Sequence, residues 1–305
     1  MNSKCVNLSE AVAQHVNDGD VVFVGGFGQC IPFAAGHELI RQGRKDLTLC
    51  RSGADILFDQ LIAAGCASKI VFGYLGNPGI GISHAFNRAV REEAIAYEDW
   101  TNFAMVLRLH AGALGIPFIP AAILQSSDIP GASIEVAQVA CPYTGERLSA
   151  IPALNPDVAL VHAQRADQEG NVQMWGLPGD TVDGANASRN VIVTVEEIVD
   201  TAVLRADPNR TILPSYRVSA VACAPWGAHP SYVQGYYGRD DDVYFAYDKL
   251  SRSPEELAGY LDEWVNSIPD RETYVEKLGD ATRRRLTGQR GPVASVSYGF
   301  EAPHV

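Results

Sequence analysis

A glycine turn behind a short apolar run is the first feature of the sequence that could serve chemistry. In the stretch DGDVVFVGGFG, residues 18–28, an apolar run leads into Gly25, Gly26 and Phe27. This pattern predicts a strand that ends in bare backbone, which can approach a nucleotide phosphate, a neighbouring helix or a reacting group. Taken alone, the turn is explained by close helix–strand packing, which is the default.

The nucleotide alternative lacks most of its signature. The dinucleotide fingerprint needs three glycines in the order G-x-G-x-x-G, and Ile31 stands where the third belongs. Asp46 is near the distance of the fingerprint's acidic residue, but it precedes a predicted strand instead of ending one. The Gly-Lys-Ser/Thr of a phosphate loop is missing from the sequence. A nucleotide site is therefore not favoured.

Other side chains with reactive groups have simpler explanations. The single histidines His84, His110 and His162 have no G-x-S-x-G or similar nucleophile motif, so we assign them core or surface roles. The pair 196–197 consists of two glutamates after a predicted strand; we favour a helix start, where negative charge is stabilised, over the alternative of a paired acid–base role. Asn102 begins another predicted helix, where a lone asparagine usually serves as a cap.

The cysteines argue against a metal or disulfide framework. They are scattered, form no C-x-x-C pair, and mostly lie in or beside apolar runs, where a reduced cysteine behaves as a small hydrophobe. The six are Cys5, Cys30, Cys50, Cys66, Cys141 and Cys223. We predict no metal site.

Composition sets the broad class. The 305 residues are 47% hydrophobic and carry a formal net charge of −12, which disfavours a nucleic-acid or anionic-membrane partner. The N-terminus has no apolar signal core, and no apolar run approaches the roughly 20 residues of a spanning helix. We predict a soluble, cytoplasmic protein.

Continuous apolar runs alternate with helical patterns, which is typical of parallel strands covered on both faces. We predict strands over residues 21–24, 47–51, 69–73, 93–97, 116–120, 158–163, 191–195 and 218–222. We predict helices over residues 8–16, 33–42, 55–64, 80–91, 101–114, 254–265 and 270–278. The segment between the fifth and sixth predicted strands is turn-rich.

Several of these stretches together resemble one enzyme family. The order of DGDVVFVGGFGQCIPFAAGHELIRQGRKDLTL, KIVFGYLGN, VHAQRADQEGNVQMWG and PWGAHPSYVQGYYGRD is similar to the α subunit of family I CoA-transferases, closest to the glutaconate CoA-transferase type. The resemblance covers roughly residues 8–280. One departure is a shorter loop after Phe27, which lacks the later glycine of many relatives.

The resemblance implies a fold and a domain organisation. The fold is an α/β, parallel-sheet, Rossmann-like CoA-transferase (NagB/RpiA-like) fold with a C-terminal helical extension. We expect residues 1–305 to form a single domain, with an α/β core over about residues 8–245 and a helical tail over about residues 250–290.

The resemblance also implies site residues. It places Gly25, Gly26 and Phe27 near a thioester, where main-chain N–H groups would meet the ligand. In related 3-oxoacid CoA-transferases a glutamine at the position of Asn102 donates its amide to the thioester oxygen, and Asn102 has the same amide on a shorter arm.

A second loop of the resemblance borders the acyl pocket. Its residues here are Gly73, Tyr74, Gly76 and Asn77. For Tyr74 the alternative is a buried aromatic whose hydroxyl is satisfied.

The nucleophile of the family is missing. Family members pass the acyl group through a glutamate carboxylate of the β subunit, in a turn after its second strand. The equivalent turn here reads Arg51-Ser52-Gly53. The chain is therefore predicted to be half of an enzyme, an α subunit that joins its β partner in an α₂β₂ or larger heteromer. The aromatic loop 232–247 is a candidate for part of the shared surface, with core packing as its rival.

The expected activity is transfer of CoA between a carboxylic acid and an acyl-CoA through a glutamyl-CoA thioester on the β subunit. No cofactor is bound permanently, and coenzyme A enters as the acyl-CoA substrate. One alternative is a CoA-thioester hydrolase of the same fold, which a neutral Asn102 disfavours because an amide cannot act as a base. Another is a non-enzymatic ligand-binding module.

Overall fold

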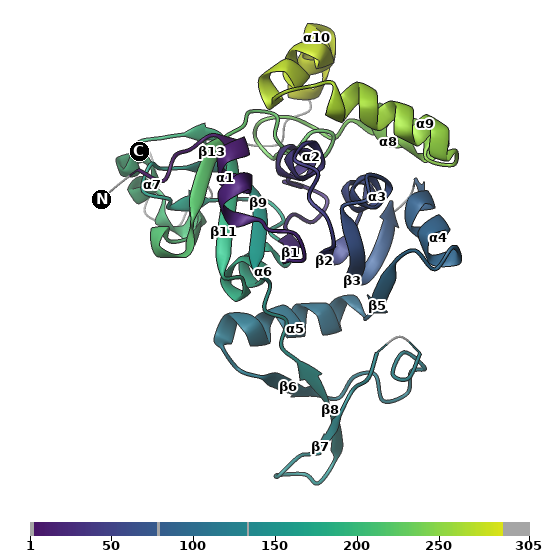
Figure 1. Ribbon diagram of the computed structural model, residues 1–305. Coiled ribbons are helices and arrows are strands. Elements are labelled where there is room, and N and C mark those ends of the chain that lie inside the picture. The colour runs from purple at the N-terminus through teal and green to yellow at the C-terminus, as the bar shows by residue number, and fades with distance from the viewer. Residues whose placement is uncertain (1–2, 78–79, 133, 289–305) are drawn as a thin grey trace.

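A ten-stranded, mostly parallel sheet forms the centre of the molecule in the computed structural model, which describes residues 3–77, 80–132 and 134–288 (Figure 1). Parallel pairing joins, in spatial order, β13 (Ala220–Cys223), β11 (Asn190–Ile198), β9 (Val158–Ala166), β1 (Val21–Val24), β2 (Leu47–Ala54), β3 (Ala67–Asn77) and β5 (Ala96–Asp99). Antiparallel additions are β4 (Gly81–Ile82), β10 (Val172–Gln173) and β12 (Thr211–Leu213). The predicted α/β class with a parallel sheet is confirmed.

Helices cover both faces of this sheet (Figure 1). One face carries α1 (Leu8–His15), α2 (Phe33–Arg41) and α3 (Ile56–Ala63), with α4 (His84–Arg91) beside α3. The other carries α5 (Asn102–Leu114) and α6 (Thr181–Ala187). The remaining short helices of this part are α7 (Thr201–Ala206), η1 (Pro208–Arg210) and η2 (Ser215–Arg217).

Each face has its own apolar core, because successive strand residues point to opposite sides. In β1, Val22 and Val24 join the cluster under α2 and α3, whereas Phe23 joins the cluster under α5 and α6. All three side chains are fully buried. This two-sided burial is why the strands are apolar throughout instead of alternating.

A small antiparallel sheet was predicted only in its first strand, as the extended segment over residues 116–120. It consists of β6 (Phe118–Ala121), β8 (Arg147–Pro152) and β7 (Gln138–Ala140), paired in that order, and projects below α5 in Figure 1. Its strands are short and only partly buried, so their sequences show no strong apolar pattern. The pair 196–197 was predicted to start a helix; both glutamates instead lie inside β11, and that prediction is wrong.

The C-terminal helices pack above α2 and α3 (Figure 1). They are α8 (Asp241–Leu250), α9 (Pro254–Leu261), the π-helical turn η3 (Asp262–Asn266) and α10 (Arg271–Thr287). Buried residues of α8 and α9 belong to the same apolar cluster as those of α2 and α3. Residues 289–290, the end of the predicted tail, lie outside the described residues. None of the helices in the described ranges is long and apolar enough to span a membrane.

The contact between α6 and β1 gives a test of core packing. A methyl group at Gly184 would lie 2.3 Å from the ring of Phe23. Overpacking of this kind typically costs about 1–3 kcal/mol, so Gly184→Ala should lower the free energy of unfolding by that amount in urea titrations. The matched control is Gly259→Ala in α9, where a methyl group meets nothing within 4 Å. That change should stabilise the chain by about 0.4–1 kcal/mol. Equal stability of both variants would contradict the described packing.

Candidate active site

The carboxyl ends of neighbouring strands open into one cavity. Ligands of open α/β sheets bind at this edge, where the strand order reverses, and here the order reverses between β1 and β9. The cavity has a volume of about 470 Å³. Its lining residues come from the ends of β1, β2 and β3, the start of α5, and the loops around residues 177 and 232–244: Phe27, Gly28, Ile31, Arg51, Gly53, Ala54, Asp55, Tyr74, Gly76, Asn77, Ile80, Asn102, Leu177, Tyr232, Arg239 and Tyr244.

The glycine turn after β1 shapes the wall of this cavity. The N–H of Gly25 donates to the carbonyl of Leu160 at 2.8 Å, and that of Gly26 donates to the hydroxyl of Thr181 at 2.9 Å. Gly26 has φ +89°, and a β-carbon there would lie 2.7 Å from the carbonyl oxygen of Cys30. These glycines are thus required by the turn itself, and their N–H groups bond to the protein.

Phe27 is the residue of this turn that reaches the cavity. Its ring lies over Gly53 of β2, where a β-carbon would stand 3.0 Å from the ring edge. A β-carbon at Gly179 would stand 2.4 Å from Cβ of Phe27. The two glycines therefore leave the space that this side chain occupies, and 41% of the residue remains exposed.

Asn102 lies at the cavity, and a different residue caps its helix. The cap of α5 is Thr101, whose hydroxyl accepts from the N–H of Ala104 at 3.0 Å. Asn102 is the first helical residue and is exposed. The default assignment of Asn102 as a cap is therefore wrong. Gly73 of β3 makes this approach possible, because a β-carbon there would lie 2.6 Å from the backbone nitrogen of Asn102.

A charge network fixes the connection between β5 and α5. Glu98 accepts from Lys69 at 2.7 Å, from the indole of Trp100 at 2.9 Å and from Arg108 at 2.9 Å. Burial raises the pKa of Glu98, but the hydrogen bonds from Lys69 and Trp100 and the charge of Arg108 outweigh it and lower the pKa to about 2. The network joins β3, β5 and α5 directly before Asn102.

The predicted acyl-pocket loop lies at the end of β3. Tyr74 lines the cavity and is 40% exposed, so it is not the buried aromatic of the alternative interpretation. Asn77 also lines the cavity but is buried, and its side-chain oxygen has no hydrogen-bond partner among the described residues. Gly76, at φ +155°, leaves room for the Tyr74 hydroxyl, which would stand 3.0 Å from a β-carbon there.

Charged residues of β2 and its end form the inner wall. Arg51 is 1% exposed, and both of its terminal nitrogens lie 3.5 Å from Oδ2 of Asp55. Oδ1 of Asp55 accepts from the N–H of Leu57 and caps α3. Burial raises the pKa of Asp55, and the neighbouring Arg51 opposes this. The predicted turn at residues 51–53 is absent, because these residues continue β2 to Ala54.

The aromatic loop 232–247 divides between core and cavity. Tyr237 and Tyr247 are buried in the core, which supports the rival explanation of their sequence. Tyr232, Arg239 and Tyr244 line the cavity. The guanidinium of Arg239 lies 5.1 Å from the ring centre of Tyr244.

The remaining reactive groups lie elsewhere. His162 is fully buried between Thr194 at 2.9 Å and Glu196 at 2.8 Å, and Glu196 also accepts from Tyr237 at 2.7 Å. This is a satisfied core network. No group of His, Cys, Asp and Glu that could hold a metal ion occurs within the described ranges, and the cysteines are free.

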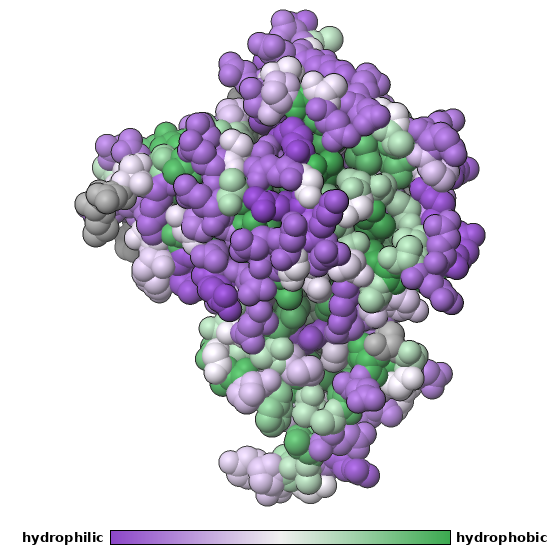
Figure 2. All heavy atoms as spheres, in the orientation of Figure 1, coloured by the Kyte–Doolittle hydropathy of each residue, from purple (hydrophilic) through white to green (hydrophobic). Residues whose placement is uncertain are grey.

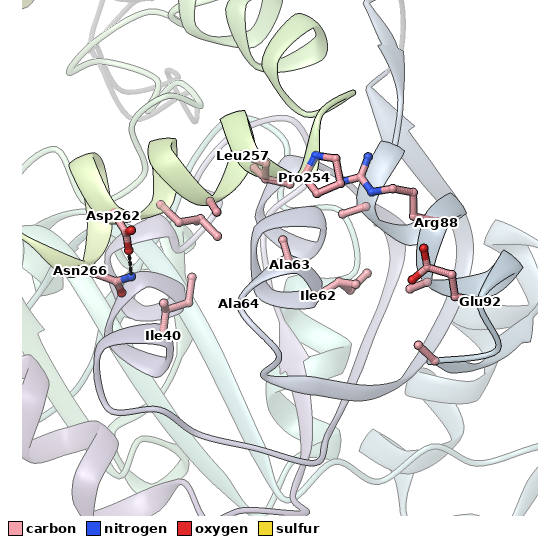
Figure 3. A pocket seen from close by; sticks show the side chains of 15 residues that line it. Ile40, Ile62, Ala63, Ala64, Arg88, Glu92, Pro254, Leu257, Asp262 and Asn266 are labelled. Carbon is pink, nitrogen blue, oxygen red and sulfur yellow. Dashed lines mark hydrogen bonds between the residues drawn. The ribbon is translucent and has the colours of Figure 1, made fainter.

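Another cavity, of about 670 Å³, lies between α3, α4 and α9 (Figure 3). Its floor is made of small and aliphatic side chains such as Ile40, Ile62 and Leu257, and Asp262 pairs with Asn266 at its edge (Figure 3). None of the candidate site residues lines it. It is larger than the cavity at the strand ends but has no grouping of amide, aromatic and cationic side chains, so we assign it no chemistry.

Comparison with known proteins identifies the family. The family model described as coenzyme A transferase matches residues 6–224, so the chain belongs to the coenzyme A transferase family. It is similar to the A subunit of 3-oxoadipate CoA-transferase from Pseudomonas knackmussii, with 41% identity over 281 residues, which cover 91% of this chain and 99% of that protein. It is also similar to the A subunit of glutaconate CoA-transferase from Acidaminococcus fermentans, with 36% identity, covering 92% of this chain and 93% of that protein.

Comparison with solved structures supports the same family membership. The crystal structure of glutaconate coenzyme A-transferase from Acidaminococcus fermentans matches with a TM-score of 0.89 at 33% identity, covering 93% of this chain and 95% of that chain. The decarboxylase AibA/AibB matches with a TM-score of 0.75 at 32% identity, covering 86% of this chain and all of that chain. The predicted membership in the α-subunit group and the predicted fold are confirmed.

The structure brings together five of the eight residues predicted for the site. Phe27, Tyr74, Gly76, Asn77 and Asn102 line one cavity. Gly25, Gly26 and Gly73 stand behind it as backbone supports.

Arg51, Asp55 and Arg239 line the same cavity and were not predicted as site residues. For Arg51 the available signal was a charged side chain inside an otherwise apolar strand.

The low pKa of Glu98 predicts a pH-dependent stability. A carboxylate whose pKa is lower in the folded than in the unfolded chain stabilises above its unfolded value of about 4.5, and the contribution disappears as the pH falls through about 2. Glu98→Gln should therefore reduce the free energy of unfolding by about 1–3 kcal/mol at pH 7. The difference from the parent should shrink towards pH 2 in urea titrations. Glu276→Gln, an exposed glutamate of α10, is the control and should change stability by less than about 0.5 kcal/mol. A pH-independent difference for Glu98→Gln would contradict the assignment.

Proposed function

We propose that this chain is the α subunit of a heteromeric CoA-transferase, which moves CoA between a carboxylic acid and an acyl-CoA. The observation that carries the proposal is an exposed carboxamide, that of Asn102, at the strand-end cavity of a chain from the coenzyme A transferase family. The relatives are named as A subunits of 3-oxoadipate and glutaconate CoA-transferases, and such a name implies a counterpart.

The proposed reaction has two exchanges. A glutamate carboxylate of the β subunit takes CoA from the acyl-CoA, which releases the first acid and forms a glutamyl-CoA thioester. The second acid then takes CoA from this thioester and regenerates the glutamate. In each exchange the carbonyl oxygen gains negative charge, and the amide of Asn102 is positioned to donate to it. Gly73 and the Glu98 network hold Asn102 in place.

The chain's own acid at the cavity is unsuited to be the nucleophile. Asp55 is buried, caps α3 with one oxygen and faces Arg51 with the other. Its carboxylate would have to abandon these contacts to attack a thioester. The catalytic carboxylate is therefore assigned to the partner.

The surface offers a place for the partner. Large apolar side chains of α5 and β6 are exposed: Phe103, next to Asn102, at 59%, Leu114 at the other end of α5 at 59%, and Phe118 at 39%. Figure 2 shows hydrophobic spheres over this lower part of the molecule. Exposed apolar surface can mark a protein interface. We propose an α₂β₂ or larger assembly in the cytoplasm, with acyl-CoA and free acid as the only ligands and no resident cofactor.

The first test is the oxyanion role of Asn102. In the assembled complex, Asn102→Ala should lower kcat about 10²- to 10³-fold, as removal of one oxyanion donor does in other enzymes. Assembly, measured by size-exclusion chromatography, should be unchanged. Asn87→Ala in α4, outside the cavity, is the matched control and should keep full activity. An Asn102→Ala rate within about twofold of the parent would refute the role.

The second test determines which of the two chains carries the nucleophile. The purified chain alone should transfer no CoA above background, and addition of its β partner should yield a heteromer with activity. Trapping of the thioester with borohydride should modify a glutamate of the β chain only. A modified Asp55, or transfer by this chain alone, would overturn the proposal. Release of free CoA from acyl-CoA at the full rate without an acceptor acid would point to a hydrolase instead.

A further inference from the structure

The hydroxyl of Thr181, the first residue of α6, accepts a hydrogen bond from the glycine turn after β1. Its Oγ1 lies 2.9 Å from the backbone nitrogen of Gly26, and Thr181 is fully buried. A β-carbon at Gly25 would lie 3.3 Å from the methyl carbon of Thr181, so the two segments are in close contact. A buried N–H group without an acceptor is costly. This hydroxyl therefore fixes the turn that carries Phe27.

The residue before Thr181 makes the corresponding contact with β2. Oδ2 of Asp180 accepts from the N–H of Ser52 at 2.9 Å, and both residues are 3% exposed. The carboxylate of Asp180 does not cap α6, and its Oδ1 has no hydrogen-bond partner in the described part of the chain. Two consecutive residues at the start of α6 thus hold the ends of β1 and β2 at once.

Phe27 lies beside both of these contacts. A β-carbon at Gly53, the residue after Ser52, would stand 3.0 Å from its ring. A β-carbon at Gly179, the residue before Asp180, would stand 2.4 Å from its Cβ. Phe27 also lines the cavity at the strand ends. The place of its ring in the cavity therefore depends on how the start of α6 is seated against the two strands.

The other end of the turn is bonded to the same segment. The side chain of Gln29, which is fully buried, donates to the carbonyls of Trp175 and Leu177 at 2.9 Å and 3.1 Å. Leu177 lines the cavity as well. The connection over residues 175–181 is thus fixed to the turn on both sides of Phe27.

We propose that Asp180 and Thr181 are positioning residues of the transfer reaction, because they fix the place of Phe27 and thereby the fit of the acyl-CoA. This inference rests on the proposed CoA-transferase function. Neither residue is among those that line the cavity, so both act through the side chains that do. The oxyanion donor, Asn102, comes from α5 and is held by the separate network of Glu98. Loss of the α6 contacts therefore weakens binding of the acyl-CoA and leaves the oxyanion donor in place.

The competing explanation is that these contacts serve folding alone. Thr194 in β11 is an example of such a contact: it is fully buried, and its Oγ1 lies 2.9 Å from Nδ1 of His162, away from the cavity. Removal of either threonine hydroxyl lowers the stability of the chain. Only removal of the hydroxyl of Thr181 shifts Phe27, so the binding of acyl-CoA distinguishes the two explanations.

The test is a double-mutant cycle on the reconstituted complex, with KM for the acyl-CoA as its readout. The donors are acetyl-CoA and succinyl-CoA, and the acceptors are glutaconate and 3-oxoadipate, the acids in the names of two relatives. Phe27→Ala and Thr181→Val should each raise KM about five- to tenfold and leave kcat within about threefold, because each removes binding that the ground state and the transition state share. The double variant should stay within about twofold of Phe27→Ala alone, since both changes act on one side chain.

Matched variants separate positioning from folding. Thr181→Ser, which keeps the acceptor oxygen, should recover most of the loss, and Asp180→Ala should raise KM in the same way as Thr181→Val. Thr194→Val should lower the melting temperature and leave KM unchanged. The effects of Thr181→Val and Asn102→Ala should multiply, because they concern different elements and different kinetic constants.

If Thr181→Val fails to assemble, Thr181→Ala and Asp180→Ala complete the same cycle with Phe27→Ala. Independent multiplication of the Thr181 and Phe27 effects on KM, or a loss of stability with KM unchanged, would overturn the proposal. An absence of transfer by the parent complex with every pair of probes would overturn the transferase function instead. The cycle would then be measured in the dissociation constant of acetyl-CoA by calorimetry, where the same coupling is expected.

Discussion

The parallel pairing of β1, β2, β3 and β5 is the constraint on which the site depends. Strands that run in the same direction end at the same edge, so the chain leaves the sheet four times within one small region. The register Arg51↔Phe72 and Gly53↔Tyr74 fixes which side chains of β2 and β3 meet there. A slip of one residue would turn Arg51 away from the cavity, because alternate residues face opposite sides of the sheet.

Glycines then decide how closely the walls approach. Gly73 brings the first turn of α5 against β3, and Gly53 and Gly179 leave room for the side chain of Phe27. A side chain at any of these positions would separate elements that now touch. The glycine turn after β1 thus acts through geometry: its amides bond to Leu160 and Thr181, and the cavity receives the aromatic ring that the turn carries.

The sequence was sufficient to predict those helices and strands that local residue patterns determine. Apolar runs and helix boundaries gave the helix over residues 33–42, observed as Phe33–Arg41, and the stop of α5 at Gly115, which has the left-handed φ of 68°. Of the small sheet it predicted only the strand over residues 116–120, because the other two strands are weakly apolar and β6 pairs with β8 across a long connection. Nor could it show that Arg239 lies in the same cavity as Arg51, because that proximity depends on how the loop before α8 folds back over the sheet. Asn102 was placed correctly at a helix start, but only the structure shows that Thr101 takes the capping role.

The end of β2 is where this chain differs from the partner that the proposed function requires. The family resemblance puts a glutamate at the position equivalent to Arg51 in the partner chain, and this chain has a guanidinium there instead. In the proposed scheme the partner supplies the carboxylate, whereas the end of β2 in this chain contributes a buried guanidinium to the cavity wall. A buried arginine whose contacts to Asp55 are 3.5 Å long costs stability in the free chain, because its desolvation is not fully compensated. The end of β2 therefore shapes and charges the cavity wall, and the proposed function assigns the nucleophile to the partner.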